Sequence, residues 1–419
     1  MIVSILGLGY IGLPTAAIVA SKNIQVLGVD TNKDIVDLIN EGRTHISEPE
    51  LDGLVKNSVN SKQLVATTKI QKADVFIIAV PTPFKEGNKP DLSFVKSACD
   101  EISTVLKKGD LVILESTCPV GATEKVREWL QNKRKDLIFP DRKNRDVQHD
   151  VSIVYSPERV LPGNVVEELV KNDRIIGGLT PKCSEKALKF YKIFVQGECA
   201  VTDSRTAELC KLVENSFRDL NIAFANEVSL ICDNLEINVW DLIALANKHP
   251  RVEILNPGPG VGGHCIAVDP WFIVDTSPEY SFLIKTARQV NDSKPEFILK
   301  KLTGVVSTLQ KEYSELKISV FGLAFKPNVS DLRESPALKI SLEVKEMGFE
   351  KLLLVEPNLS KLPQGLISDQ TSLVNTEVAL SEADIVLFLV AHESFKEIKL
   401  EALKNKQLID SIGLINHLT

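Results

Sequence analysis

The amino-acid sequence predicts an α/β protein in which two doubly wound units are joined by a long central helix and a helical middle domain. Short apolar runs alternate with helical patterns near the N-terminus and again from about residue 318. Between them, from about Ser204 to Asn247, apolar residues recur at steps of three and four. Because 419 residues exceed what one core usually holds, we predict domains at 1–200, 201–300 and 301–419.

Charge and cysteine usage exclude several classes of protein. The net charge of −7 argues against a nucleic-acid partner. The seven cysteines lack the paired spacing of a metal site, so we expect no metal and a reducing, cytoplasmic location. Met1–Ser21 is uncharged, but it lacks basic residues and is interrupted by glycines and Pro14. We therefore read it as a buried strand and helix rather than a signal peptide, and expect a soluble protein without a membrane partner.

The first predicted strand, Ile2–Leu6, runs into a glycine pattern, Gly7, Gly9 and Gly12, and then into a helix to about Ser21. A second strand, Val26–Val29, ends at Asp30. This order is typical of a Rossmann-like dinucleotide site, in which the glycines allow a tight turn and close approach to a pyrophosphate. Asp30 would bind ribose hydroxyls and repel a 2′-phosphate, which favours NAD over NADP. An ordinary strand-to-helix turn is the alternative.

Three later strands end in polar residues. Val75–Val80 is followed by Thr82, Leu111–Leu114 by Thr117, and Ile153–Tyr155 by Glu158. In an open α/β sheet, ligands bind at the carboxyl ends of strands, so these side chains are candidate site residues. The alternatives are turn or cap roles for the threonines and a solvated loop position for the acid. The charged segment Gln131–Asp150 is read as a surface excursion.

A stripe of polar residues follows one face of the predicted long helix, with Lys211, Asn215 and Arg218 at i, i+4 and i+7. A solvated face is the alternative explanation. The apolar residues of the same helix suit a core or a dimer interface; they are Leu209, Leu212, Val213, Phe217, Leu220, Phe224 and Val228.

The segment Pro257–Trp271 holds four glycines and three prolines, so we predict a loop with close backbone approaches. It contains Cys265, with His264 beside it and Asp269 four residues later. A thiolate here would be a nucleophile, and backbone N–H groups of the loop could stabilise an oxyanion formed on it. A buried structural cysteine is the alternative.

A second α/β unit begins with the strand Ile318–Phe321 and lacks the full glycine set of the first. We predict a helix at Pro336–Met347, and a loop-like stretch at Leu359–Thr376. The later strands are predicted at Leu352–Val355, Ile385–Val390 and Leu408–Ile409.

With these motifs in order, the chain resembles the UDP-glucose/GDP-mannose dehydrogenase family over essentially its whole length. The matching stretches are Gly7–Gly12, Glu115–Glu124, Ser156–Arg159, Glu208–Arg218, Pro257–Asp269 and Phe321–Pro336. The resemblance implies oxidation of a sugar C6 alcohol to a carboxylate with two NAD⁺. It also implies a homodimer or higher homo-oligomer whose sites are completed across subunits.

The substrate that the resemblance implies is UDP-N-acetyl-D-mannosamine, used for surface polysaccharide. His264 and Val268 stand where members acting on UDP-glucose usually carry Ser and Lys. The stretches 158–163, 247–252 and 264–271 also resemble the branch acting on N-acetylhexosamines. A UDP-N-acetylglucosamine 6-dehydrogenase and a catalytically silent nucleotide-sugar-binding protein are the alternatives.

The resemblance also implies roles for individual residues. Cys265 would attack an aldehyde and carry a thiohemiacetal and then a thioester, with Lys211 as base if burial lowers its pKa. Glu158 and Asp269 would orient water, and Thr117 and Asn215 would hydrogen-bond nearby. The implied cofactor contacts, besides the three glycines, are Tyr10, Ile11, Asp30, Thr82, Thr117, Lys326 and Arg333. The implied substrate contacts are Arg159, Val160, Lys211, Asn215, Arg218, His249, Arg251 and Gly262.

Overall fold

The computed structural model describes residues 1–85, 87–144, 148–161 and 163–418. The chain divides into two compact units. The N-terminal unit holds Met1–Glu214 and Trp271–Pro278, and the C-terminal unit holds Asn215–Pro270 and Glu279–Thr419. The units are described one at a time below.

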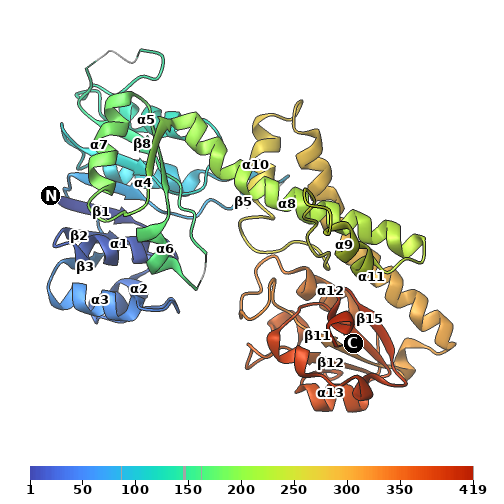
Figure 1. Ribbon diagram of the computed structural model, residues 1–419. Coiled ribbons are helices and arrows are strands. Elements are labelled where there is room, and N and C mark those ends of the chain that lie inside the picture. The colour runs from blue at the N-terminus through green and yellow to red at the C-terminus, as the bar shows by residue number, and fades with distance from the viewer. Residues whose placement is uncertain (86, 145–147, 162, 419) are drawn as a thin grey trace. The chain divides into compact units, whose positions relative to one another are not determined.

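The N-terminal unit is built on an eight-stranded sheet (Figure 1). Six strands follow the order β3-β2-β1-β4-β7-β8, all parallel, which is the Rossmann arrangement that the glycine motif predicts. Strand β9 then pairs antiparallel with β8, and β10 pairs parallel with β9. The bounds are β1 Ile2–Leu6, β2 Gln25–Val29, β3 Leu64–Thr67, β4 Val75–Ile78, β7 Leu111–Leu114, β8 Ser152–Tyr155, β9 Arg174–Gly178 and β10 Cys199–Asp203.

Helices cover both faces of this sheet because its strands are apolar on both sides. In β4, Val75 and Ile77 pack into one core, while Phe76 and Ile78 pack into the other. The helices are α1 Gly12–Ser21, α2 Lys33–Asn40, α3 Leu51–Asn60, α4 Ser93–Ser103, α5 Ala122–Lys133, α6 Val165–Lys171 and α7 Pro181–Tyr191, and a small hairpin pairs β5 Phe84–Lys85 with β6 Lys89–Pro90.

The C-terminal unit has a five-stranded parallel sheet in the order β13-β12-β11-β14-β15, again with its core on two faces. Its strands are β11 Lys317–Phe321, β12 Lys351–Val355, β13 Thr371–Leu373, β14 Ile385–Phe388 and β15 Gln407–Asp410. Its helices are α9 Val239–Ala246, α11 Phe282–Leu309, α12 Pro336–Glu346, α13 Thr376–Glu382 and α14 Leu414–Leu418, with 3-10 turns at Tyr313–Glu315, Gln364–Leu366, Glu393–Glu397 and Leu400–Leu403.

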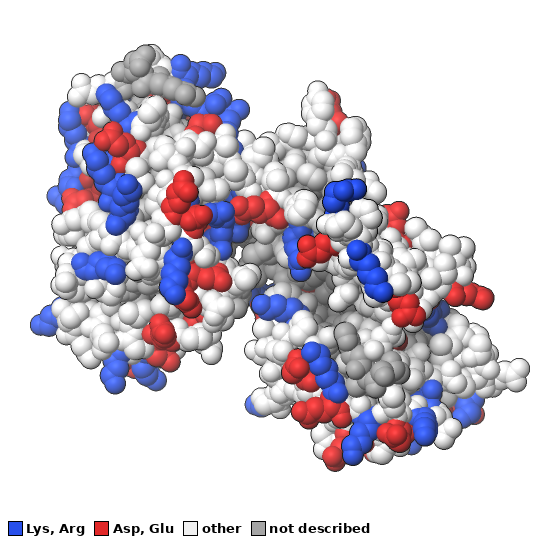
Figure 2. Space-filling view, in the orientation of Figure 1, with Lys and Arg blue, Asp and Glu red and all other residues white. Residues whose placement is uncertain are grey.

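The chain passes between the units after Glu214, after Pro270 and after Pro278, and two helices contain the first two of these points. They are α8 Ser204–Asn234 and α10 Asp269–Thr276. Among the described residues, no helix is both long and apolar enough to cross a membrane. On the face shown in Figure 2, basic and acidic side chains are interspersed.

The fold class predicted from the sequence is confirmed, with several corrections to its elements. The helical stretch after Ser204 is two helices, because Asn238 caps a new one by accepting from Trp240 N and Asp241 N. The cysteine loop ends at Val268, since Pro270 is tolerated in the first turn of α10. The predicted loop Leu359–Thr376 contains β13 and a 3-10 turn.

The other differences are at element ends. Strand β4 stops at Ile78 rather than Val80, and α5 extends into the predicted surface excursion as far as Lys133. Residues 145–147 of that excursion, and Pro162, lie outside the described residues. The predicted three-domain boundaries stay a prediction.

Lys294 gives the C-terminal unit a testable pH dependence. Its side chain is 5% exposed, and its Nζ donates to Ser229 Oγ at 2.7 Å. Burial lowers the pKa of Lys294 to about 8. Between about pH 8 and 10.5 the unfolded chain therefore binds more protons, so stability rises with pH over that window. We expect Lys294→Met to stabilise the unit at pH 7 by up to about 3 kcal/mol, and calorimetry should show the gain shrinking towards pH 10.5.

Candidate active site

The glycine turn after β1 is shaped for close backbone approach. Gly7 has φ +91°, and a Cβ on it would lie 2.6 Å from Ala79 O. A Cβ on Gly12 would lie 1.8 Å from Gly7 O, whereas a Cβ on Gly9 would meet nothing within 4 Å. The first and third glycines are thus required by packing, and the second leaves open space where a pyrophosphate fits.

Asp30, at the end of β2, lies beside this turn. Its Oδ2 accepts from Leu8 N–H at 2.9 Å, and its Oδ1 accepts from Asn32 N–H at 2.9 Å. The carboxylate is half-buried and is positioned by these two bonds. The turn and the acid therefore have the arrangement that NAD requires.

Tyr10 and Ile11 of the glycine turn are both half-buried. The hydroxyl of Tyr10 donates to Glu48, whose Oε1 also accepts from Gly163 N–H at 2.7 Å. Glu48 is 7% exposed and ties the glycine turn to the segment that follows Glu158. The sequence analysis missed this acid, because no motif surrounds it.

The ends of β4 and β7 converge as predicted. Thr82 Oγ1 donates to the carbonyl oxygen of Thr117 at 2.7 Å. The turn after Thr117 is held by Glu208, a fully buried acid near the start of α8. Its carboxylate accepts from Gly121 N–H at 2.6 Å, and from Thr123 N–H at 2.7 Å. Burial raises the pKa of Glu208. This contact fixes the Thr117 turn against the helix that carries Lys211.

Glu158 is not the solvated loop acid of the alternative interpretation. Its side chain is 8% exposed and pairs with Arg174, and its Oε1 accepts from Arg159 N–H at 2.7 Å. The guanidinium of Arg159 pairs with Glu214 at 2.9 Å. Val160 packs against the apolar core of the unit. The Glu158 carboxylate is therefore largely buried and is held in place by contacts within the N-terminal unit.

The polar stripe of α8 is graded in exposure. Lys211 and Asn215 are half-buried, one helical turn apart, while Arg218 is exposed. In the C-terminal unit, Asn215 Nδ2 donates to Asp269 Oδ2. Asp269 is 2% exposed and begins α10. Asn215 and the first residue of α10, which follows the cysteine loop, are thus joined by a hydrogen bond.

Cys265 lies in the turn that precedes α10. Its carbonyl oxygen accepts from Val268 N–H at 3.0 Å and from Asp269 N–H at 2.8 Å. The residue is half-buried, and none of the seven cysteines, all of which the structure describes, takes part in a disulfide. The thiol is therefore carried by a short hydrogen-bonded turn between the glycine-rich loop and a helix, a placement suited to a nucleophile.

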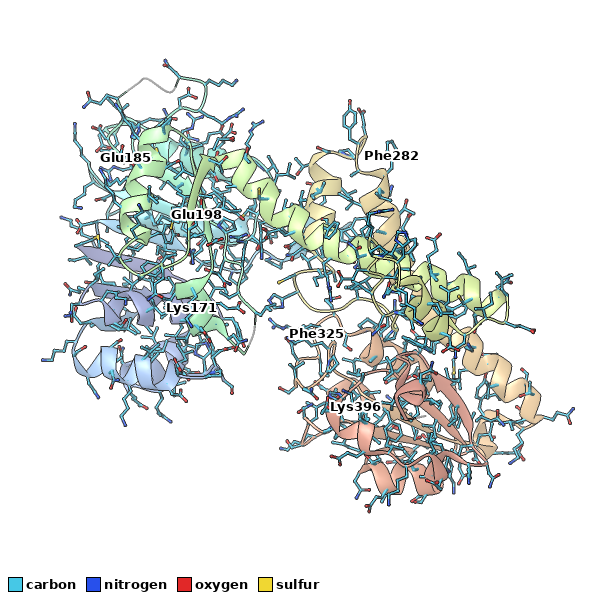
Figure 3. The ribbon with its side chains drawn as sticks, viewed as in Figure 1. Lys171, Glu185, Glu198, Phe282, Phe325 and Lys396 are labelled. Atoms are coloured by element: carbon cyan, nitrogen blue, oxygen red, sulfur yellow. The ribbon has the colours of Figure 1, made fainter. Side chains whose placement is uncertain are left out.

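The glycine-rich loop packs closely on the segment 325–336 of the C-terminal unit. Gly263 N–H donates to Arg333 O at 3.0 Å, and a Cβ on Gly262 would lie 2.5 Å from Glu334 O. A Cβ on Gly263 would lie 2.9 Å from the ring of Phe325, which Figure 3 labels. Lys326 is half-buried, and the exposed Arg333 pairs with Asp331. The loop that carries Cys265 is therefore packed and hydrogen-bonded against the segment that carries Lys326 and Arg333.

A buried polar network anchors the start of the cysteine loop. Gly258 N–H donates to Asn226 Oδ1 at 2.9 Å, and Asn226 Nδ2 donates to Asn291 Oδ1 at 2.8 Å. Asn291 in turn bonds Asp219, which pairs with Arg288 at 2.7 Å. Each of these residues thus has at least one hydrogen-bond partner on α8 or α11, so the start of the loop is fixed to these helices.

His249 and Arg251 follow α9 and are both exposed in the single chain. Arg251 N–H donates to His249 Nδ1 at 3.3 Å. Their predicted contact with a substrate stays a prediction.

Comparison with known proteins identifies the family. A model of the NAD binding domain of the UDP-glucose/GDP-mannose dehydrogenase family matches residues 1–195. Models of the central domain and the UDP binding domain of that family match residues 205–293 and 319–417. The chain belongs to this family. It is a dehydrogenase with an NAD-binding N-terminal domain, so the resemblance found in the sequence is confirmed, and so is the NAD cofactor.

Individual relatives are similar along nearly their whole length. The UDP-N-acetyl-D-mannosamine dehydrogenase of Yersinia pestis is 56% identical over 416 residues, 98% of each chain. An NDP-N-acetyl-D-galactosaminuronic acid dehydrogenase of Ralstonia nicotianae is 54% identical over 412 residues, covering 98% of this chain and 96% of the relative. The solved UDP-D-ManNAc dehydrogenase of Pyrococcus horikoshii superposes with a TM-score of 0.87 at 36% identity, covering 99% of this chain and 96% of that one.

Proposed function

We propose that this dehydrogenase oxidises C6 of UDP-N-acetyl-D-mannosamine from alcohol to carboxylate. The observation that carries the proposal is the turn at Cys265, whose carbonyl oxygen accepts from the N–H of Asp269, the residue that Asn215 hydrogen-bonds. The 56% identity to the Yersinia pestis relative supports the choice of sugar. We further propose that the product serves surface polysaccharide synthesis and that the enzyme is cytoplasmic.

When bound, NAD⁺ would accept one hydride in each of the two oxidations, so that two NAD⁺ would be consumed per sugar. The residues of the chain would move the proton, carry the covalent intermediate and orient the water. Lys211 takes the proton of the C6 hydroxyl, directly or through water. The Cys265 thiolate then adds to the aldehyde carbon to form a thiohemiacetal, whose oxidation leaves a thioester. Glu158 and Asp269 orient the water that cleaves the thioester, releasing the carboxylate and the thiol. Thr117 and Asn215 hydrogen-bond to the reacting groups.

The remaining roles concern binding. The glycine turn and Asp30 are positioned by the contacts described above to hold the dinucleotide. We propose that Tyr10, Ile11, Thr82, Thr117, Lys326 and Arg333 also contact the cofactor. The proposed substrate contacts are Arg159, Val160, Lys211, Asn215, Arg218, His249, Arg251 and Gly262.

A second candidate substrate is the UDP-linked N-acetylgalactosamine sugar. The 54% identity to the Ralstonia nicotianae relative supports it. The same residues would perform the same chemistry, and only the configuration of the sugar ring would differ.

The test is an NADH assay with the UDP-linked N-acetyl sugars of mannosamine, glucosamine and galactosamine and with UDP-glucose, counting NADH per sugar consumed. We expect two NADH per molecule with the mannosamine sugar only. Activity with another sugar would keep the chemistry and replace the substrate. One NADH per sugar would mean that the reaction stops at the aldehyde and that the thioester route is wrong.

We also propose that the chain is a homodimer built on the apolar face of α8. This face consists of residues that the helical spacing predicts to be covered, yet they are exposed in the single chain. They are Leu209 (41% exposed), Val213 (47%), Phe217 (69%), Phe224 (54%) and Ile231 (51%). Because they recur at helical steps, they form one continuous stripe that a second copy can cover with the same stripe.

Charging that stripe should separate the copies. We expect the double variant Phe217→Glu with Phe224→Glu to be a monomer, because each glutamate would have to be buried without a partner. Size-exclusion chromatography with light scattering measures the mass directly. Phe94→Glu, at a position that is 48% exposed in the N-terminal unit, is the matched control and should leave the mass unchanged. A wild-type monomer at micromolar concentration would overturn the proposal.

A further inference from the structure

Arg174 lies between two carboxylates in the N-terminal unit. Its Nη1 donates to Glu115 Oε1 at 3.0 Å, and its Nη2 donates to Glu158 Oε2. The side chains of Arg174 and Glu115 are 3% and 0% exposed. The guanidinium also stacks 4.6 Å from the ring centre of Tyr191. Arg174, Glu115 and Glu158 therefore form a buried cluster with fixed contacts. Glu158 is the acid proposed to orient water.

The reversed strand of the sheet explains how Arg174 reaches this place. Strands β8 and β9 are antiparallel, with Val154 opposite Gly178 and Tyr155 opposite Gly177. Continuing this register by three residues places position 174 opposite position 158. If β9 ran parallel to β8, its first residue would lie at the amino end of β8, away from Glu158. The one antiparallel pairing among the described residues of this sheet thus places Arg174 at the carboxyl end of β8, beside Glu158.

We propose that Arg174 is a positioning residue that holds the Glu158 carboxylate in the orientation needed for the thioester-cleaving step. The inference rests on the proposed function, which gives Glu158 its water. Arg159 N–H holds Oε1 at 2.7 Å and Arg174 holds Oε2, so both carboxylate oxygens are fixed. Each oxygen keeps a lone pair that can accept from a water molecule. The planar guanidinium can serve both acids at once, which a lysine ammonium cannot do with the same geometry.

Glu115 competes with Glu158 for the single charge of Arg174. Burial raises the pKa of Glu115 to about 7. Its Oε1 also accepts from Tyr191 Oη at 3.3 Å, while its Oε2 is buried and finds no hydrogen-bond partner within the described part of the chain. An acid in this state readily carries a proton, and the charge of Arg174 is then available to Glu158. Glu115 therefore affects how strongly Arg174 binds Glu158, and it has no assigned contact with the water.

The test is Arg174→Lys, studied with the full-length enzyme, NAD⁺ and the sugar that the wild type oxidises. We expect steady-state turnover to fall roughly tenfold to a hundredfold, a share of the ~10²–10⁴ that a positioned acid or base contributes. NADH release in the first turnover should stay close to wild type, so the Cys265 adduct should accumulate and be visible by intact mass. Arg205→Lys is the control, since Arg205 pairs with Glu124 in the same unit. Equal loss in every phase, or no loss, would overturn the proposal.

Two further variants keep the outcomes distinct. Glu115→Gln mimics the protonated form of Glu115 and leaves the charge of Arg174 to Glu158, so this variant should turn over like the wild type without accumulating the adduct. Adduct accumulation in Glu115→Gln contradicts the proposal even if Arg174→Lys fails to fold. Glu158→Gln tests the underlying function. If Glu158→Gln accumulates the adduct and Arg174→Lys does not, only the inference about Arg174 fails. If Glu158→Gln accumulates none, the proposed role of Glu158 fails.

Discussion

Cys265→Ser is expected to abolish formation of the uronate while leaving both ligands bound. A serine hydroxyl is not ionised at neutral pH and has no base assigned to it, so addition to the aldehyde should slow by on the order of 10³-fold or more. NADH production from the sugar should fall accordingly. Isothermal titration with NAD⁺ and with UDP should give unchanged affinities, because the turn at Cys265 is held by backbone bonds that serine preserves.

The control for this loss is another thiol. Cys199 is half-buried in β10, and Cys199→Ser should keep full turnover. If Cys265→Ser also kept two NADH per sugar, the covalent route would be wrong. If the wild type bound both ligands but oxidised no sugar, the protein would be a binding protein that keeps the fold.

Gly12→Ala is expected to lower the stability of the N-terminal unit, whereas Gly9→Ala is expected to lower the affinity for NAD⁺. The methyl group introduced by Gly12→Ala would lie 1.8 Å from the backbone oxygen of Gly7, an overlap that no side-chain rotation relieves. We expect a loss of at least about 3 kcal/mol in the N-terminal unit, and a fall of about 6–12 °C in its thermal midpoint by calorimetry. The methyl group introduced by Gly9→Ala would meet no protein atom within 4 Å, so that variant should melt like the wild type.

Gly9→Ala should instead weaken NAD⁺ binding by at least about tenfold, because its methyl group would occupy the space that the pyrophosphate needs. Titration of each variant with NAD⁺ separates the two effects. A stable Gly12→Ala enzyme, or a Gly9→Ala enzyme with unchanged NAD⁺ affinity, would show that the glycines act differently from this account.

The parts of the site that the sequence predicted well depend on local rules. The glycine turn and Asp30 follow from fixed spacing, and the meeting of Thr82 with Thr117 follows because parallel strands end at one edge of a sheet. The resemblance implied that Asn215 hydrogen-bonds near the water that Asp269 orients, and in the structure Asn215 bonds Asp269 itself. The first two of these need only the order of elements, which hydrophobic periodicity indicates, whereas the third came from the resemblance.

What sequence reasoning missed depends on pairing between distant segments. Arg174 looks like a surface charge before an apolar strand, and nothing local shows that β9 runs antiparallel to β8. Asn226 is a polar residue in an apolar helix, a signal that could have drawn attention, but its partner Asn291 is 65 positions away. The spacing in α8 predicts a helix, yet it does not show that Phe217 is left exposed by its own chain.

The N-terminal unit is discontinuous along the chain, and this has a consequence for truncated forms. The chain leaves the unit after Glu214 and returns to it for Trp271–Pro278. In the returning segment Phe272 is fully buried and packs edge-on to Phe84, with ring centres 5.9 Å apart. A fragment ending at residue 214 would therefore expose the surface that Phe272 covers. A single proteolytic cut at any point would leave residues of both units on at least one fragment, so limited proteolysis at one site cannot yield either unit alone.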